Sequence, residues 1–242
     1  RFSRSLSLLD RAASDLSPPC IQWRFSGFAH YMVNKPMPVS PTVLVLGSYP
    51  CIKPMHGGQI RLAKILQAYR QAGFHTQSVN VYCLGAVAEP RGPNDIDYPG
   101  TSVFRQWRGL AVPLVDDLTS GRFVVGEQSA YQKATSKLPA SPLIIHLEQP
   151  WLFPLIQRWR QEGVLGEHRL IYGSQNVEAP LKRAILKQYR VVQADAVAED
   201  VASLEVRACR ESDIVLAVSE SDRQALSRVS DTPVILAENG IE

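Results

Sequence analysis

The sequence predicts an α/β fold, with a doubly wound, mostly parallel sheet of the Rossmann-like type. From residue 42 onward, short apolar runs alternate with segments of helical periodicity. The runs are apolar at consecutive positions, as expected for strands that are covered on both faces of a parallel sheet. Alternation of strand and helix favours parallel pairing through helical crossovers, and so predicts this architecture.

The first 41 residues differ in pattern from the rest of the chain. Five prolines between residues 18 and 41 interrupt this segment repeatedly, and proline breaks both helices and strands. We expect residues 1–41 to be an arm or linker and residues 42–242 to be one domain. Because the chain starts with Arg1 and lacks an initiator methionine, we expect it to be a segment of a longer protein.

The composition is that of an ordinary soluble domain. The 242 residues are 45% hydrophobic and 20% charged, with a net charge of +3, which is too small and too scattered to indicate nucleic acid binding. No apolar run approaches the length of a membrane span. The four cysteines (Cys20, Cys51, Cys83 and Cys209) are widely spaced, so neither a zinc site nor a disulfide framework is expected. Reduced thiols suit a cytoplasmic protein.

The first half of the domain is predicted as follows. A strand covers Val43–Leu46, and the next segment has apolar residues near the helical period and a glycine stop at Gly73. The further predictions are helix Gln59–Gln71, strand His75–Tyr82, loop Glu89–Gly100, short strand Ser102–Phe104, a helical segment Val115–Leu138 interrupted near Gly121 and Gly126, strand Leu143–Ile145 and helix Trp151–Gln161.

The second half continues the alternation to the end of the chain. The predicted elements are strand Arg169–Tyr172, helices Val177–Tyr189 and Ala194–Arg210, strand Asp213–Val218, helix Ser219–Ser227 and strand Pro233–Ala237. Ser219 is predicted to cap its helix, with Asp222 three positions later in place of the usual glutamate of a capping box.

A pair of glycines is the first candidate binding feature. Gly57 and Gly58 come between the first strand and its helix. Glycine lets a ligand approach the backbone closely, and a helix N-terminus presents N–H groups that suit phosphate. Arg61, one turn later, is placed either to reach a phosphate or to lie on the solvated face of the helix. The alternative for the pair is a tight strand-to-helix turn.

Polar side chains also follow the later strands. In a doubly wound sheet, ligands bind outside the carboxyl ends of the strands. His146 and Glu148 follow one strand, and Asn176 and Glu178 follow the next. Trp151 is placed either to stack on a sugar or to pack in the core. Helix capping is the simpler explanation for Glu178 and Ser219.

Several nucleotide-binding and hydrolase classes are excluded by missing motifs. The chain has no G-x-G-x-x-G run directly after the first strand and no carboxylate at the end of the second, so a dehydrogenase or epimerase relative is not expected. It also has no Walker A sequence and no G-x-S-x-G elbow.

The order of these features resembles the N-terminal domain of a GT-B retaining glycosyltransferase of the large family 4. The resemblance covers about residues 42–242, and no single motif carries it. The matching pieces, in chain order, are the first strand with Gly57-Gly58 and a helix ending in Gln71-Ala72-Gly73-Phe74-His75, then Ile144-Ile145-His146-Leu147-Glu148-Gln149-Pro150, Tyr172-Gly173-Ser174-Gln175-Asn176-Val177-Glu178, the run from Ser212 to Asp222, and Leu236-Ala237-Glu238-Asn239-Gly240-Ile241-Glu242.

The resemblance implies transfer of a sugar from a nucleotide-sugar donor to a glycan, a lipid-linked or another acceptor, with retention. It places Gly57, Gly58 and Arg61 at the donor diphosphate and the acceptor, and Trp151, Asn176, Glu178 and Ser219 on the acceptor side. It implies no metal and no separate cofactor, because amides and basic side chains neutralise the leaving phosphate. Many members have His-x-His where this chain has His146 and Glu148, which are the catalytic candidates here.

The sequence departs from the family in its ending. It stops where a C-terminal donor-binding domain is expected, so we expect this chain alone to lack transferase activity. The alternative is a non-catalytic GT-B-like binding or assembly module. A basic stripe, formed by Lys182, Arg183, Lys187, Arg190, Arg207 and Arg210, is either solvated surface or a contact with the cytoplasmic face of a membrane.

Overall fold

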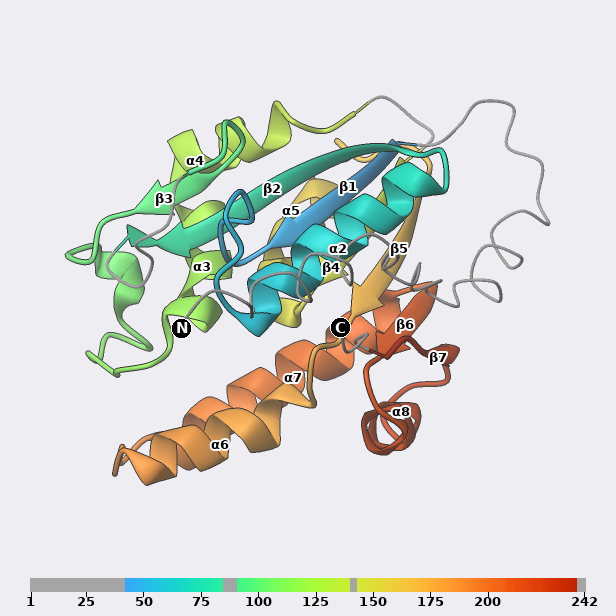
Figure 1. Ribbon diagram of the computed structural model, residues 1–242. Helices are drawn as coiled ribbons and strands as arrows, with labels where there is room; N and C mark the ends of the chain where they lie inside the picture. The colour runs from blue at the N-terminus through green and yellow to red at the C-terminus, as the bar shows by residue number, and fades with distance from the viewer. Residues whose placement is uncertain (1–41, 85–90, 140–142, 239–242) are drawn as a thin grey trace, which may run out of the picture.

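The computed structural model describes residues 42–84, 91–139 and 143–238, which form one open sheet with helices on both faces (Figure 1). The sheet has seven strands in the order β3-β2-β1-β4-β5-β6-β7. Every neighbouring pair is parallel. The strands are β1 (Thr42–Gly47), β2 (His75–Cys83), β3 (Ile96–Tyr98), β4 (Leu143–Glu148), β5 (His168–Gly173), β6 (Ile214–Ala217) and β7 (Val234–Leu236). The predicted doubly wound α/β fold is confirmed.

The helices alternate with these strands, close to the predicted ranges. They are α2 (Gly57–Gln71), α3 (Asp116–Gly126), α4 (Gln128–Thr135), α5 (Phe153–Gln161), α6 (Glu178–Gln188), α7 (Ala194–Glu211) and α8 (Glu220–Ser227), with short 3₁₀ turns η2 (Val103–Arg105) and η3 (Pro150–Leu152). None of the helices in the described part of the chain is long and apolar enough to cross a membrane.

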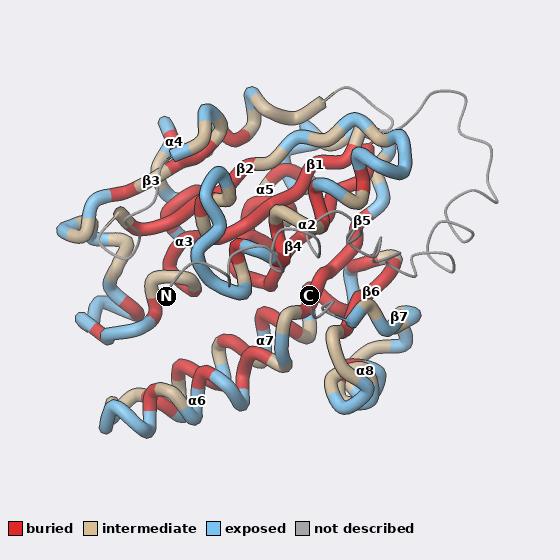
Figure 2. The backbone as a smooth tube through the Cα atoms, viewed as in Figure 1, coloured by how far each residue is buried: buried red, intermediate tan, exposed pale blue. Residues whose placement is uncertain are grey.

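The strands bury both of their faces, which explains their continuous apolar runs. Successive side chains of a strand point to opposite faces. Val43 and Val45 of β1 therefore pack under α2, together with Ile144 of β4. Leu44 and Leu46 join the larger core on the other face, which α3, α4, α5 and α7 cover. Figure 2 shows the central strands as the most continuously buried part of the chain.

One short strand was missed and another was placed wrongly. The predicted loop Glu89–Gly100 contains β3, which pairs with the end of β2. The predicted strand Ser102–Phe104 is wrong, since Val103–Arg105 forms a 3₁₀ turn that is capped by the Ser102 hydroxyl, which accepts from the Phe104 amide. Both errors have one cause. Strands of three residues carry too few side chains to show a periodicity, so only the neighbouring strand decides where pairing occurs.

The predicted helical interruption lies at Glu127, next to Gly126, and not at Gly121. Helix α3 passes through Gly121 without a break. A Cβ at this position would collide with the main-chain oxygen of Trp151. Glycine is therefore needed there for close packing of α3 on η3, and not to end the helix.

Two of the sequence-based predictions lie outside the described residues. They are the arm of residues 1–41 and the asparagine-glycine junction at residues 239–240.

Candidate functional site

The topology itself selects one edge of the sheet as the candidate site. Strand order reverses between β1 and β4, and the helices that follow these two strands, α2 and α5, pack on opposite faces. In doubly wound sheets this divergence leaves a crevice at the carboxyl ends of the two strands. The segments that reach this point are the β1–α2 loop and the residues directly after β4 and β5.

A buried ion pair lies just inside this edge, between the sheet and α2. Arg61 Nε of α2 donates to Oε1 of Glu148, the last residue of β4, over 2.7 Å, and the two side chains are 5% and 0% exposed. Glu148 shares a strand face with Ile144, which packs under α2. Gln175 Nε2, from the residues after β5, donates to the same Oε1 over 3.0 Å. The carboxylate therefore joins three elements.

His146 extends this network along the strand. It lies two residues before Glu148 and so on the same face, and its Nε2 is 2.9 Å from Oε2 of Glu148. Its Nδ1 is 2.9 Å from the hydroxyl of Tyr69 on α2. In the tautomer in which Nε2–H donates to the carboxylate, Nδ1 accepts from the Tyr69 hydroxyl. Both rings are buried.

Glu148 is held in its ionised form by these partners. Burial alone raises the pKa of its carboxyl, but the Arg61 charge and the hydrogen bonds from His146 and Gln175 outweigh burial and lower the pKa below the usual value. Both oxygens accept hydrogen bonds within the protein. The geometry is that of a positioning group that fixes α2 against β4, as buried and fully partnered carboxylates do.

Gln149 is the central polar residue at the switch point. Its Oε1 accepts from Ser48 Oγ (3.1 Å) and from the Tyr49 hydroxyl, both in the loop after β1. Its Nε2 donates to Oε1 of Glu178 over 3.2 Å. Its backbone is unusual for a residue with a side chain, with φ 65° and ψ 162°. Strain of this kind costs on the order of 1–3 kcal/mol and concentrates at functional sites.

The N-terminus of α2 borders this cluster. The N–H groups of Gly57, Gly58 and Gln59 precede the first intrahelical hydrogen bond, from Ile60 N to His56 O (3.0 Å). Within the described part of the chain, no side chain caps this end, and its first turn has no acidic residue. A Cβ at Gly58 would come within 3.1 Å of the Tyr49 ring, whereas a Cβ at Gly57 would meet nothing within 4 Å.

Glu178, which contacts Gln149, is joined to a second buried glutamate, Glu205. The Glu178 amide, at the start of α6, donates to both oxygens of Glu205 on α7 (3.0 and 3.2 Å). The Tyr172 hydroxyl donates to the same carboxylate over 3.1 Å. Burial, with smaller contributions from Glu205 and Asp117, raises the pKa of the Glu178 carboxyl to about 7.

The remaining sequence candidates lie in different surroundings. Trp151 is 1% exposed, with Lys182 Nζ 5.4 Å from its ring centre, so the ring lies in the core and not at a surface where a sugar can stack. Asn176 is exposed, and its main-chain oxygen accepts from Ser174 Oγ. Ser219 caps α8 by accepting from Asp222 N over 3.1 Å, as predicted.

The basic stripe is partly neutralised within the protein. Lys182 Nζ is buried and pairs with Asp117 (2.5 Å). Arg183 and Lys187 both pair with Asp195 (3.0 and 2.9 Å). Three of the six basic side chains of the stripe are therefore paired with carboxylates.

Ser48, Tyr49 and Tyr69 are members of the site that sequence reasoning missed. Ser48 and Tyr49 directly follow β1, so their position at a strand end was the available signal. Tyr69 gave no such signal, because an aromatic residue on the apolar face of a helix is ordinary core.

No protein-family model matches the sequence, and no curated protein is significantly similar to it. Solved structures with partly similar arrangements include UDP-forming alpha,alpha-trehalose-phosphate synthases. For the enzyme from Burkholderia vietnamiensis, the identity is 15% and the TM-score 0.45, over 84% of this chain and 49% of that one. For the enzyme from Burkholderia xenovorans in complex with glucose-6-phosphate, the values are 15% and 0.42, over 76% and 42%.

This chain therefore spans less than half the length of these solved structures. With 15% identity and TM-scores below 0.5, these similarities do not indicate a function for the chain. The functional interpretation rests on the geometry of the switch point and on the residues that form it.

Proposed function

We propose that residues 42–242 are the acceptor-side half of a GT-B glycosyltransferase, which moves a sugar from a nucleotide-sugar donor to a glycan, a lipid-linked or another acceptor with retention. One observation carries the proposal. The uncapped N-terminus of α2 with its two glycines lies beside the polar cluster of Tyr49 and Gln149, at the switch point of the sheet. This combines groups that suit a diphosphate with groups that suit sugar hydroxyls.

In this proposal the donor diphosphate lies against the main-chain amides of Gly57 and Gly58. The positive end of the helix dipole stabilises the charge that develops on the leaving phosphate, without a metal ion. Ser48, Tyr49 and Gln149 offer hydroxyl and amide groups to a sugar. His146, Glu148 and Arg61 hold α2 and β4 in register behind this surface and act as positioning residues.

The nucleotide is proposed to bind mainly to a second domain that faces this edge. We therefore expect residues 1–242 alone to give no turnover of a nucleotide sugar in a coupled assay.

A non-catalytic GT-B-like binding or assembly module is the second candidate. The observation that favours it is the state of Glu148, which stands where many family members have a histidine. Its carboxylate is buried and all of its contacts are within the protein. Glu148 is therefore not placed to act as an acid or a base on a substrate.

The test measures binding of UDP-, ADP- and GDP-sugars to the full-length protein by calorimetry. Gly57→Ala is the informative variant, because the added methyl group meets no atom of the described residues within 4 Å but occupies the space proposed for the diphosphate. We expect it to keep or raise the melting temperature while weakening binding about tenfold.

Gln128→Ala, at the exposed first residue of α4, is the matched control and should bind like the wild type. Equal affinity of Gly57→Ala and the wild type would exclude the α2 N-terminus from the site. Binding without turnover by the full-length protein would favour the module.

A further inference from the structure

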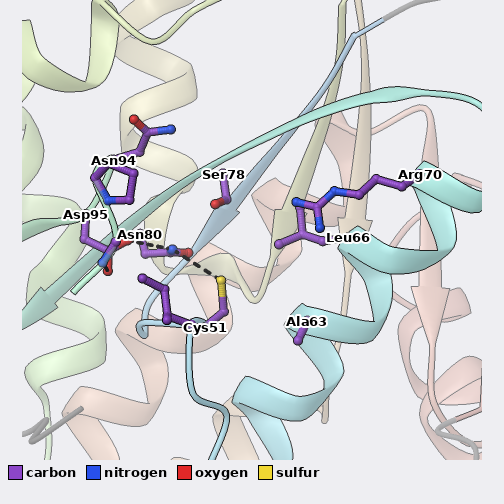
Figure 3. A pocket seen from close by; sticks show the side chains of 11 residues that line it. Cys51, Ala63, Leu66, Arg70, Ser78, Asn80, Asn94 and Asp95 are labelled. Carbon is purple, nitrogen blue, oxygen red and sulfur yellow. Dashed lines mark hydrogen bonds between the residues drawn. The ribbon is translucent and has the colours of Figure 1, made fainter. Parts of the chain in front are cut away.

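A pocket of about 300 Å³ lies beside α2, over the strand β2 (Figure 3). Its lining comes from the β1–α2 loop, from α2, from β2 and from the residues before β3. The lining residues are Cys51, Ile52, Ala63, Leu66, Arg70, Ser78, Asn80, Gly92, Pro93, Asn94 and Asp95. This volume is at the lower end of the range for small-molecule sites in proteins.

The wall formed by β2 is polar where a covered parallel strand is usually apolar. Thr76, Ser78, Asn80 and Tyr82 occupy alternate positions and therefore share one face of the strand. On the same face of the sheet, Val43 and Val45 of the neighbouring strand pack under α2. Strands of parallel sheets are usually apolar on both faces, so this row of polar side chains is unusual. It makes this face of β2 a candidate contact for a polar ligand.

The inner end of the pocket is organised by Asp95. Its carboxylate accepts from Asn80 Nδ2 (2.9 Å), Tyr82 OH (3.0 Å) and Gly92 N (2.7 Å). Lys133 Nζ donates to its main-chain oxygen over 2.6 Å. The negative charge of Asp95 is therefore well compensated, and it fixes the loop that closes this end.

Asn80 fixes the same end of the pocket from β2. It is 1% exposed, and its Nδ2 donates to Asp95 over 2.9 Å. Its Oδ1 accepts no hydrogen bond from the described residues and lies against Gly47 of β1. Burial raises the pKa of the neighbouring Cys51 thiol, which therefore stays neutral beside it.

The opposite end of the pocket has a cation without an acidic partner. Arg70 Nε donates to Thr76 Oγ1 over 2.8 Å, and among the described residues its guanidinium pairs with no carboxylate. Arg91, near the other end, pairs instead with Asp97. Figure 3 shows Arg70 and the Asn94–Asp95 segment on opposite sides of the lining.

We propose that this pocket is a second binding site, which takes a small polyhydroxylated molecule with a single anionic group, a sugar monophosphate. Arg70 binds the phosphate, because a guanidinium forms charge-assisted hydrogen bonds with phosphate oxygens. Ser78 binds a hydroxyl, and Ala63 and Leu66 provide an apolar surface for the C–H groups of the ring. The described lining residues include no aromatic ring on which a nucleotide base could stack.

This site is separate from the switch-point site. It lies over β2, whereas the switch point lies between β1 and β4. The proposal does not depend on sugar transfer, and either can fail without the other.

The test is calorimetry with glucose 6-phosphate, glucose and inorganic phosphate on the whole chain. We expect glucose 6-phosphate to bind and each of its two parts to bind at least about tenfold more weakly. Arg70→Gln removes the cation and should weaken binding of glucose 6-phosphate about tenfold or more. Ala63→Phe fills the pocket from α2 without any change of charge and should abolish binding.

Arg122→Gln is the matched control, because Arg122 is exposed, hydrogen-bonds a main-chain oxygen and lies outside the pocket. It should bind like the wild type. Binding of a nucleotide sugar by Arg70→Gln with unchanged affinity would confirm that the two sites are distinct. The proposal is overturned if glucose 6-phosphate does not bind at millimolar concentration, or if Arg70→Gln and Ala63→Phe bind it as well as the wild type does.

Discussion

At the scale of single residues, the pair of Arg61 and Glu148 holds two opposite charges buried inside the candidate site. Two charges removed from water are tolerated only when each keeps close partners. Glu148 has three such donors in Arg61, His146 and Gln175. Removal of one partner therefore leaves a charge that neither water nor protein compensates fully.

The first prediction follows from this contact. Arg61→Met should lower the free energy of unfolding by about 3–5 kcal/mol, because the Glu148 carboxylate stays buried without its cation. The double variant Arg61→Met/Glu148→Gln should recover more than half of this loss. Urea unfolding followed by circular dichroism measures both, and a single-variant loss below about 1 kcal/mol would show that the pair is not a main stabilising contact.

The sequence identified both members of this pair as candidates but did not predict that they pair. Their positions are 87 residues apart, and only the sheet brings them together. Arg61 was assigned either to a phosphate or to solvent, since an arginine in a helix is usually exposed. Arg61 is buried because α2 packs on β4, and the local sequence of α2 does not show this packing. Local features were more predictable, and the capping role of Ser219 depends on residues within one helical turn.

At the scale of elements, α6 begins without a cap of its own. Its N-cap residue Val177 makes no side-chain hydrogen bond. The missing acceptor is supplied from α7 by Glu205, which takes the Glu178 amide. The two helices therefore form a hairpin whose packing completes the hydrogen bonding of one of its members.

The second prediction tests this cross-helix cap. Glu205→Ala should lower the free energy of unfolding by about 1–3 kcal/mol, because the buried Glu178 amide loses its acceptor. Amide hydrogen exchange should accelerate in the first turn of α6 more than elsewhere. Glu199→Ala, at an exposed position of the same helix, serves as the control and should change neither quantity. Uniform acceleration along the chain would point to loss of packing and not of a cap.

Long elements, whose side chains show a clear periodicity, were predicted well, and short elements were predicted poorly. Helix α7 has 18 residues and was found almost to the residue. Strand β3 has three residues in a segment rich in proline and glycine, and was read as loop. Its pairing is decided by the end of β2, which the local sequence does not contain.

At the scale of the whole molecule, Glu178 couples global stability to pH. The folded-state pKa of its carboxyl is raised to about 7 from an ordinary value of 4.5. Between these pH values the folded state binds a proton that the unfolded state has released. This contribution therefore makes the free energy of unfolding fall as pH rises from about 4.5 to about 7, and leaves it level above.

The third prediction is that replacing Glu178 removes this pH dependence of the free energy of unfolding. Glu178→Gln keeps an oxygen that can accept from Gln149 but carries no charge. At pH 8 it should be more stable than the wild type by up to about 3 kcal/mol, and the difference should vanish near pH 4.5. Unfolding in urea at several pH values measures it. A difference that is constant across pH would mean that the carboxyl titrates normally in the folded protein.

The β1–α2 loop contacts both the switch point and the pocket over β2. Its first residues, Ser48 and Tyr49, contact Gln149 at the switch point, while Cys51 and Ile52 line the pocket over β2. One stretch of backbone thus borders both the switch point and the pocket, for which different ligands are proposed. If either ligand selects among conformations of this loop, the other must feel the same free-energy difference, because linkage between two sites is reciprocal. The dissociation constants then close a thermodynamic cycle, in which each ligand changes the affinity for the other by the same factor.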